Sequence, residues 1–88
     1  MKIKEGYLLR NVAGNYIVVA VGEAGIDFNG IITINETGAF LWKELEKGSS
    51  ESELISKLTK EYEVSEEIAA KDVSSFINTM KEAELLEL

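Results

Sequence analysis

The 88-residue sequence contains no cysteine, no histidine and no proline. Without cysteine there is neither a disulfide nor a thiol nucleophile, and without histidine there is no imidazole base. Cysteine and histidine are also the usual ligands of zinc and copper, so those ligands are missing too. A metal site built from carboxylates alone stays open as an alternative, but the sequence has no calcium-loop spacing of alternating acidic residues with a central glycine. We therefore expect no metal ion and no other cofactor.

Long apolar runs and an excess of positive charge are also missing. No stretch approaches the roughly 20 apolar residues of a membrane span, and residues 1–6 hold no apolar run of signal-peptide length. Together with the absence of cysteine, this favours a cytoplasmic protein. Sixteen acidic and nine basic residues give a net charge of -7, which disfavours nucleic acid and anionic membranes as partners. A protein or peptide is the partner that we expect.

The sequence also contains no recognised motif of catalytic residues. The glycines at positions 22, 25, 30 and 38 match neither the dinucleotide-binding nor the phosphate-loop pattern. Acidic neighbours such as Glu66 and Glu67 point in different directions on a helix and usually form a solvated face. We expect no catalytic residues and no enzyme activity.

The order of strand and helix signals predicts the fold class. The length suits one domain over residues 1–88, and apolar runs separated by turn residues predict strands over 7–12, 16–21 and 30–34. Asn35 is the N-cap residue of a first predicted helix, which Gly48 ends. Residues 50–53 (SESE) form a capping box for a second helix, and Ser65 is the N-cap residue of a third. Residues 85–88 are predicted to be a short apolar tail. The result is an α+β domain, a three-stranded antiparallel β-meander followed by three helices that cover one face, in a winged helix-turn-helix-like arrangement.

The third predicted strand lacks protection against pairing with another chain. In a meander the first and third strands are the edges, and natural edges usually carry charges, proline or bulges. The first carries Arg10, whereas the third reads Ile31, Ile32, Thr33 and Ile34. One interpretation is that Ile32 and Ile34 face the core and a loop or helix covers Ile31. The other is β-augmentation, in which an extended peptide adds a strand to this edge.

Three further features of the helices bear on that choice. The third predicted helix carries an apolar stripe at helical spacing, formed by Val73, Phe76, Ile77 and Met80. This stripe would supply the second wall of a groove, with Lys81 at its rim, although most of the stripe must pack in the core. Trp42 is expected in the core. Gly38 lowers helix propensity in a first turn, and close packing against the sheet is the expected reason for it.

Three segments of the sequence resemble the family of PqqD-like proteins. They are "NGIITINETGAFLWKELEKG", "LISKLTKEYEVS" and "KDVSSFINTMKEAELLEL", and the resemblance covers about residues 7–88. It implies a domain that binds the leader segment of a ribosomally made precursor peptide as an extra strand and delivers it to a modifying enzyme, frequently a radical SAM protein. Synthesis of pyrroloquinoline quinone in particular is not implied. Carried over by position, the edge strand would be Ile31, Ile32, Thr33 and Ile34, and the helix face nearest the groove would include Asp72, Val73, Phe76, Ile77 and Met80. Together with Lys81 at the rim, these are the predicted peptide-binding residues.

Two alternatives of other classes stay open. A winged-helix DNA-binding regulator would need a basic recognition helix, but residues 65–88 contain two lysines against six acids. A structural homodimer would pair two third-strand edges with each other, and this would mask the peptide site.

Overall fold

A computed structural model describes residues 1–22 and 32–87 of the chain. Strands β2 (Tyr7–Val12), β3 (Asn15–Ala20) and β4 (Ile32–Ile34) form an antiparallel sheet in the order β2-β3-β4. Helices α2 (Glu36–Lys47), α3 (Glu51–Tyr62) and α4 (Glu66–Glu82) follow. The predicted meander and three helices are thus confirmed. The predicted loop from residue 23 on and the start of the third predicted strand, with Ile31, lie outside the described residues.

The hairpin between β2 and β3 turns at two residues with positive φ. These are Ala13 at 52° and Gly14 at 85°, and such a pair matches the right-handed twist of the two strands. The Asn11 side chain accepts a hydrogen bond from Gly14 N at 3.2 Å. Val12 consequently pairs with Asn15, and this register carries Leu9 opposite Val18.

Cap residues set the start of each helix, as the sequence predicts. The side chains of Asn35, Ser50 and Ser65 accept hydrogen bonds from the backbone N–H groups three residues later, at 2.7, 3.2 and 3.2 Å. Gly48, with φ of 93°, follows α2 and donates its N–H to the carbonyl of Leu45. The strand-to-helix junction at Asn35 is therefore fixed by local chemistry.

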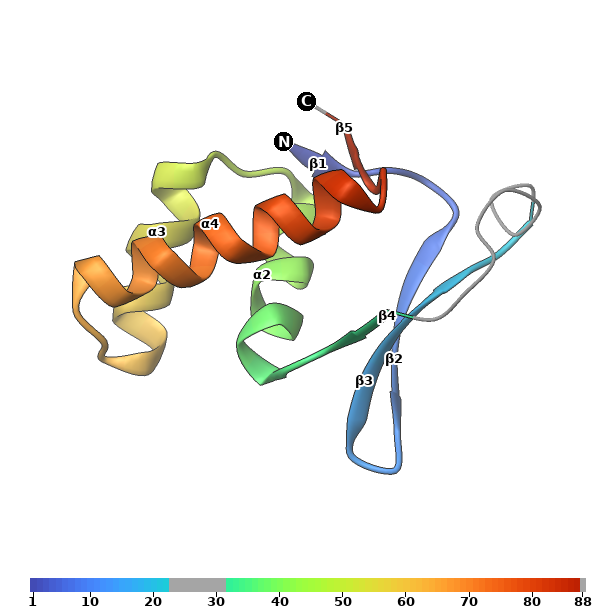
Figure 1. Ribbon diagram of the computed structural model, residues 1–88, viewed down its shortest axis with the longest axis horizontal. Helices are drawn as coiled ribbons and strands as arrows, with labels where there is room; N and C mark the ends of the chain where they lie inside the picture. Colours follow the sequence, from blue (N-terminus) through green and yellow to red (C-terminus); the bar gives the residue numbers. More distant parts are fainter. Residues whose placement is uncertain (23–31, 88) are drawn as a thin grey trace.

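The core lies mainly among the helices. Its largest fully buried side chains are Trp42, Leu41, Leu45, Leu54, Leu58, Met80, Leu85, Val18 and Val73. The predicted core position of Trp42 is confirmed. The sheet adds one fully buried residue, Val18, and the half-buried Leu9, Ile32 and Ile34 pack beside it. Figure 1 shows the three helices grouped on one side, whereas the β2–β3 hairpin extends away from them.

A second, two-stranded sheet was missed by the sequence reasoning. Strand β1 (Lys2–Ile3) pairs with β5 (Leu86–Glu87), near the end of the chain that was predicted to be only an apolar tail. The Lys4 N–H also donates to the carbonyl of Leu85 at 2.9 Å, and Figure 1 shows β1 and β5 beside the last turns of α4. None of the helices that the structure describes is long and apolar enough to cross a membrane.

Candidate functional site

Strand β4 is an edge of the three-stranded sheet. It pairs with β3 alone, through Ile32 with Val18 and Ile34 with Tyr16. No other strand within residues 1–22 and 32–87 pairs with its second side. The three described residues of β4 carry no charge, so the protection that is usual for an edge strand is missing here.

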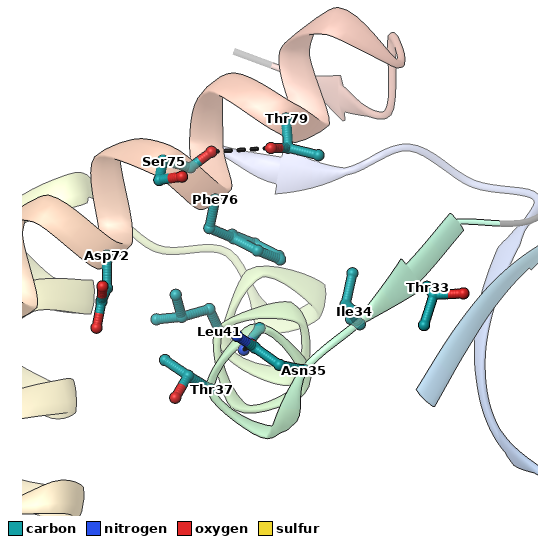
Figure 2. A pocket seen from close by; sticks show the side chains of 10 residues that line it. Thr33, Ile34, Asn35, Thr37, Leu41, Asp72, Ser75, Phe76 and Thr79 are labelled. Carbon is teal, nitrogen blue, oxygen red and sulfur yellow. Dashed lines mark hydrogen bonds between the residues drawn. The ribbon is translucent and has the colours of Figure 1, made fainter. Parts of the chain in front are cut away.

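A hollow of about 260 Å³ lies between the end of β4, the start of α2 and the side of α4 (Figure 2). Each of these elements supplies part of its wall. Its lining residues are Thr33, Ile34, Asn35, Thr37, Gly38, Leu41, Asp72, Ser75, Phe76 and Thr79. The hollow is therefore continuous with the open edge strand.

Gly38 allows the walls of this hollow to approach each other. A Cβ atom at this position would lie 3.2 Å from the Cβ of Ile34, 3.2 Å from Oδ1 of Asn35 and 3.5 Å from Cδ1 of Phe76. The first two distances are shorter than an ordinary van der Waals contact. The prediction that Gly38 permits close packing against the sheet is confirmed, and Phe76 of α4 closes in on the same point.

The α4 wall is polar along its rim and apolar at its base. Asp72, Ser75 and Thr79 follow one another at steps of three and four residues, which places them in one line along the helix. The Thr79 hydroxyl donates to the carbonyl of Ser75 at 3.0 Å (Figure 2). In the described part of the chain, no cation forms an ion pair with the exposed Asp72. The hollow thus combines the Phe76 ring with a carboxylate that is free to meet a positive charge.

The structure brings some of the predicted site residues together and separates others. The hollow is lined by Thr33 and Ile34 of β4 and by Asp72 and Phe76 of α4. The half-buried Ile32 precedes Thr33 in β4. Ile31 cannot be placed, because it lies outside the described residues. Thr37, Ser75 and Thr79 were not predicted, although the three- and four-residue steps from Asp72 could have indicated the last two.

The remaining predicted residues of α4 do not reach the hollow. Val73, Ile77 and Met80 are at most 4% exposed and belong to the core, so they support the wall from behind. Lys81 is exposed. It follows Asp72 by nine residues, and at about 100° per residue it points to the opposite side of the helix. Burial and helical direction leave Asp72 and Phe76 as the members of this set that face the hollow.

The side chains around the hollow are suited to binding. Among the described residues, no group of three or more acidic side chains could hold a metal ion. The hollow is lined by hydroxyl groups, one amide and one carboxylate. Its donors, acceptors and apolar floor suit the binding of a polar chain with some apolar side chains.

A β-meander followed by three helices, with an open edge strand beside the last helix, defines a winged-helix-like α+β domain. The chain belongs to the PqqD family, since the model of that family, described as Coenzyme PQQ synthesis protein D (PqqD), matches residues 9–86. This confirms the family resemblance of the sequence. A search of curated protein sequences found no match.

Two solved structures share the fold. "TbiB1 in Complex with the TbiA(beta) Leader Peptide" is 21% identical with a TM-score of 0.76, and the match covers 99% of this chain and 95% of that one. "Lasso peptide synthetase B1 complexed with the leader peptide" is 20% identical with a TM-score of 0.74, over 96% of this chain and 93% of that one. The same α+β architecture therefore occurs in two proteins that bind leader peptides.

Proposed function

We propose that this protein is a non-catalytic peptide-binding chaperone of peptide modification. It captures the leader segment of a ribosomally made precursor peptide as an additional strand on β4, and it presents that peptide to a modifying enzyme such as a radical SAM protein. The observation that carries the proposal is the uncharged edge of β4, which no strand pairs with within residues 1–22 and 32–87, next to the hollow on α4. Family membership and the leader peptides named with the two similar structures support it.

The two parts of the site have different tasks in this proposal. The backbone N–H and C=O groups of β4 that point away from β3 pair with the peptide, and such bonds supply affinity for any extended chain. Alternate peptide side chains then enter the hollow, where Phe76 and Ile34 offer apolar surface and Asp72 offers charge. Selectivity among peptides consequently rests on the hollow rather than on the strand.

The benefit to the modifying enzyme is a higher local concentration of its substrate. A leader held on this protein keeps the attached core peptide close to the active site, so the second encounter becomes nearly intramolecular. This protein needs no catalytic groups of its own for that task.

A proline scan of β4 tests the proposal. Proline removes a backbone donor, and the N–H groups of a strand alternate between its two sides. The N–H of Thr33 therefore points to one side of β4, and the N–H groups of Ile32 and Ile34 point to the other. The variants are Thr33→Pro, Ile32→Pro and Ile34→Pro. Proline at a position whose N–H points away from β3 should weaken binding of a fluorescently labelled leader peptide and keep the fold. We expect a loss of about tenfold or more for the outward-pointing position, since a bond to a buried partner is removed.

Circular dichroism identifies the variants that stay folded, and Asn11→Pro at the far edge of the sheet is the control. Asn11 is exposed and lies on β2, away from the hollow. Because Val12 and Asn15 pair directly across the two-residue turn, the Val12 N–H faces β3 and that of Asn11 faces away from it. Unchanged peptide affinity in every folded β4 variant would contradict capture by strand addition.

A further inference from the structure

The outer face of the three-stranded sheet is a second apolar surface that the proposed function does not use. Side chains alternate between the faces of a strand, and the buried Val18 marks the inner face. The opposite face carries Leu8, Arg10, Val12, Asn15, Ile17, Val19, Val21 and Thr33. Among these, Leu8, Val12 and Val21 are 37%, 54% and 42% exposed.

No described element covers this face. Ile17 and Val19 are half-buried, yet neither packs against the core cluster that includes Leu9, Ile32 and Ile34 on the inner side. The three helices stand together on the other side, and the hairpin projects beyond them (Figure 1). Contiguous apolar surface of this kind on a small domain marks an interaction site more often than an isolated exposed residue does.

The charge on this face favours one kind of binding partner over another. Arg10 lies in the middle row of the sheet, opposite Ile17, which in turn pairs with Thr33. Within the described ranges, Arg10 has no ion pair, and the outer face contains no acidic residue. The face is thus apolar around a single cation, in a protein whose net charge is -7.

A second copy of the chain is a poor occupant. In a two-fold symmetric contact, a residue at the centre of the patch meets its own copy. Two Arg10 guanidinium groups would then face each other without a carboxylate, and uncompensated charges in an interface are costly. A partner with a carboxylate ringed by apolar side chains matches both the charge and the apolar surface, and arginine is common at such contact centres.

We propose that the outer face of β2-β3-β4 is the docking surface for the peptide-modifying enzyme, which presents a carboxylate within an apolar patch to Arg10. This inference rests on the proposed function for the identity of the enzyme. A peptide added beside β4 extends the sheet sideways and leaves the outer face free, so both partners can be held at once. In the extended sheet, a peptide side chain on the outer face would lie next to Thr33, in line with Ile17 and Arg10.

Calorimetric titration with a purified radical SAM peptide-modifying enzyme tests the surface. Arg10→Glu reverses the central charge, and Ile17→Thr removes apolar area but keeps a β-branched residue. We expect Arg10→Glu to weaken enzyme binding about tenfold or more and Ile17→Thr by about threefold or more, as for central contact residues. Lys60→Glu is the matched charge reversal on an exposed residue of α3, and it should leave enzyme binding unchanged.

The same variants distinguish this inference from the peptide site. All three should bind labelled leader peptide as the wild type does, because none of the substituted residues lines the hollow. If the wild type binds enzyme through this face but no peptide, the docking surface stands and the proposed function fails. Absence of enzyme binding by the wild type, or equal binding by folded Arg10→Glu and Ile17→Thr, would overturn the docking surface. A wild-type dimer in sedimentation velocity that Ile17→Thr dissociates would overturn it as well, in favour of a second copy.

Discussion

At the scale of single residues, Gly38 controls the distance between β4 and α4. Its lack of a side chain costs helix propensity, but a Cβ would approach Ile34 and Asn35 to 3.2 Å. Asn35 cannot withdraw easily, since its Oδ1 holds the cap hydrogen bond to Gly38 N at 2.7 Å. The requirement for glycine is thus steric rather than conformational.

Gly38→Ala should therefore not deliver the gain of about 1 kcal/mol that alanine brings to an unobstructed helix position. We expect the free energy of unfolding in urea to fall instead, because the strand and the cap must shift to admit the methyl group. Ser74→Ala, at an exposed position of α4, is the control and should be neutral or slightly stabilising. An increase of the full amount in Gly38→Ala would show that the contact relaxes without cost.

Asp72 is the residue that gives the hollow its charge. If a cationic residue of the leader docks against it, Asp72→Asn should weaken peptide binding about three- to fivefold at low salt, the magnitude of an exposed ion pair. The difference should disappear at high salt because mobile ions screen exposed charges. Fluorescence titration at the two salt concentrations measures both effects.

Glu67→Gln on the same helix serves as the control for Asp72→Asn. Glu67 is exposed and does not line the hollow, so its neutralisation should change the affinity far less. Equal effects of the two substitutions would mean that Asp72 acts only through the overall negative charge.

At the scale of elements, an ion pair joins the first two helices. Nζ of Lys57 on α3 lies 2.9 Å from Oε2 of Glu44 on α2. The hydrogen bond from Lys57 lowers the pKa of the Glu44 carboxyl, and the bond to Glu44 raises the pKa of the Lys57 ammonium. The Glu44 contribution is present above its unfolded pKa of about 4.3 and is lost as the pH falls through the lower folded value. The Lys57 contribution is present below about pH 10.4 and is lost as the pH rises through the higher folded value.

Lys57→Gln should accordingly destabilise the protein slightly at neutral pH, because solvent screens this surface pair. The difference from wild type should shrink as the pH falls through the lowered pKa of Glu44 in the folded wild type, because protonation of the carboxyl removes the ion pair. Urea unfolding between about pH 3 and pH 8 provides the measurement. Lys60→Gln, an exposed residue without an ion pair in the described part of the chain, should show no such dependence, and a pH-independent loss in Lys57→Gln would contradict the assignment.

At the scale of the whole molecule, the small sheet β1–β5 ties both ends of the described chain to the helices. Leu85 is fully buried and Leu86 is 8% exposed, while the backbone of Met1 accepts a hydrogen bond from Ser49 N at 2.9 Å. In a domain of this size the net stability is small, of the order of 5 kcal/mol or somewhat more. Two short strands can therefore supply an appreciable part of it.

Leu86→Ala should lower the free energy of unfolding by about 2 kcal/mol or more, the usual cost of truncating a buried leucine. Glu87→Ala removes an exposed side chain from the same strand and should change stability little. Thermal and urea unfolding of the two variants provide the comparison. A similar small effect in both would show that β5 contributes little to the fold.

The sequence by itself determined the elements whose signals are local. Caps at Asn35, Ser50 and Ser65, the stop at Gly48 and the change from strand to helix periodicity each depend on neighbours a few residues away. The interpretation of the third strand as an edge that binds a peptide followed from its lack of charge together with the family resemblance. The backbone N–H and C=O groups at a helix end need hydrogen-bond partners within one or two turns. The residue types near that end therefore suffice to predict where the helix begins or stops.

Only the tertiary structure decided what depends on distant partners. Strands β1 and β5 are too short to show a periodicity, and they exist because each satisfies the backbone of the other. The apolar stripe of helix α4 was predicted to pack mostly in the core and to offer only its flank to a peptide, but the sequence could not tell which residues form that flank. Packing buried Val73, Ile77 and Met80 and left the line of Asp72, Ser75 and Thr79 beside β4. Periodicity tells which side chains share a face of a helix, but the rotation of that helix against its neighbours is set by the packing of the whole core.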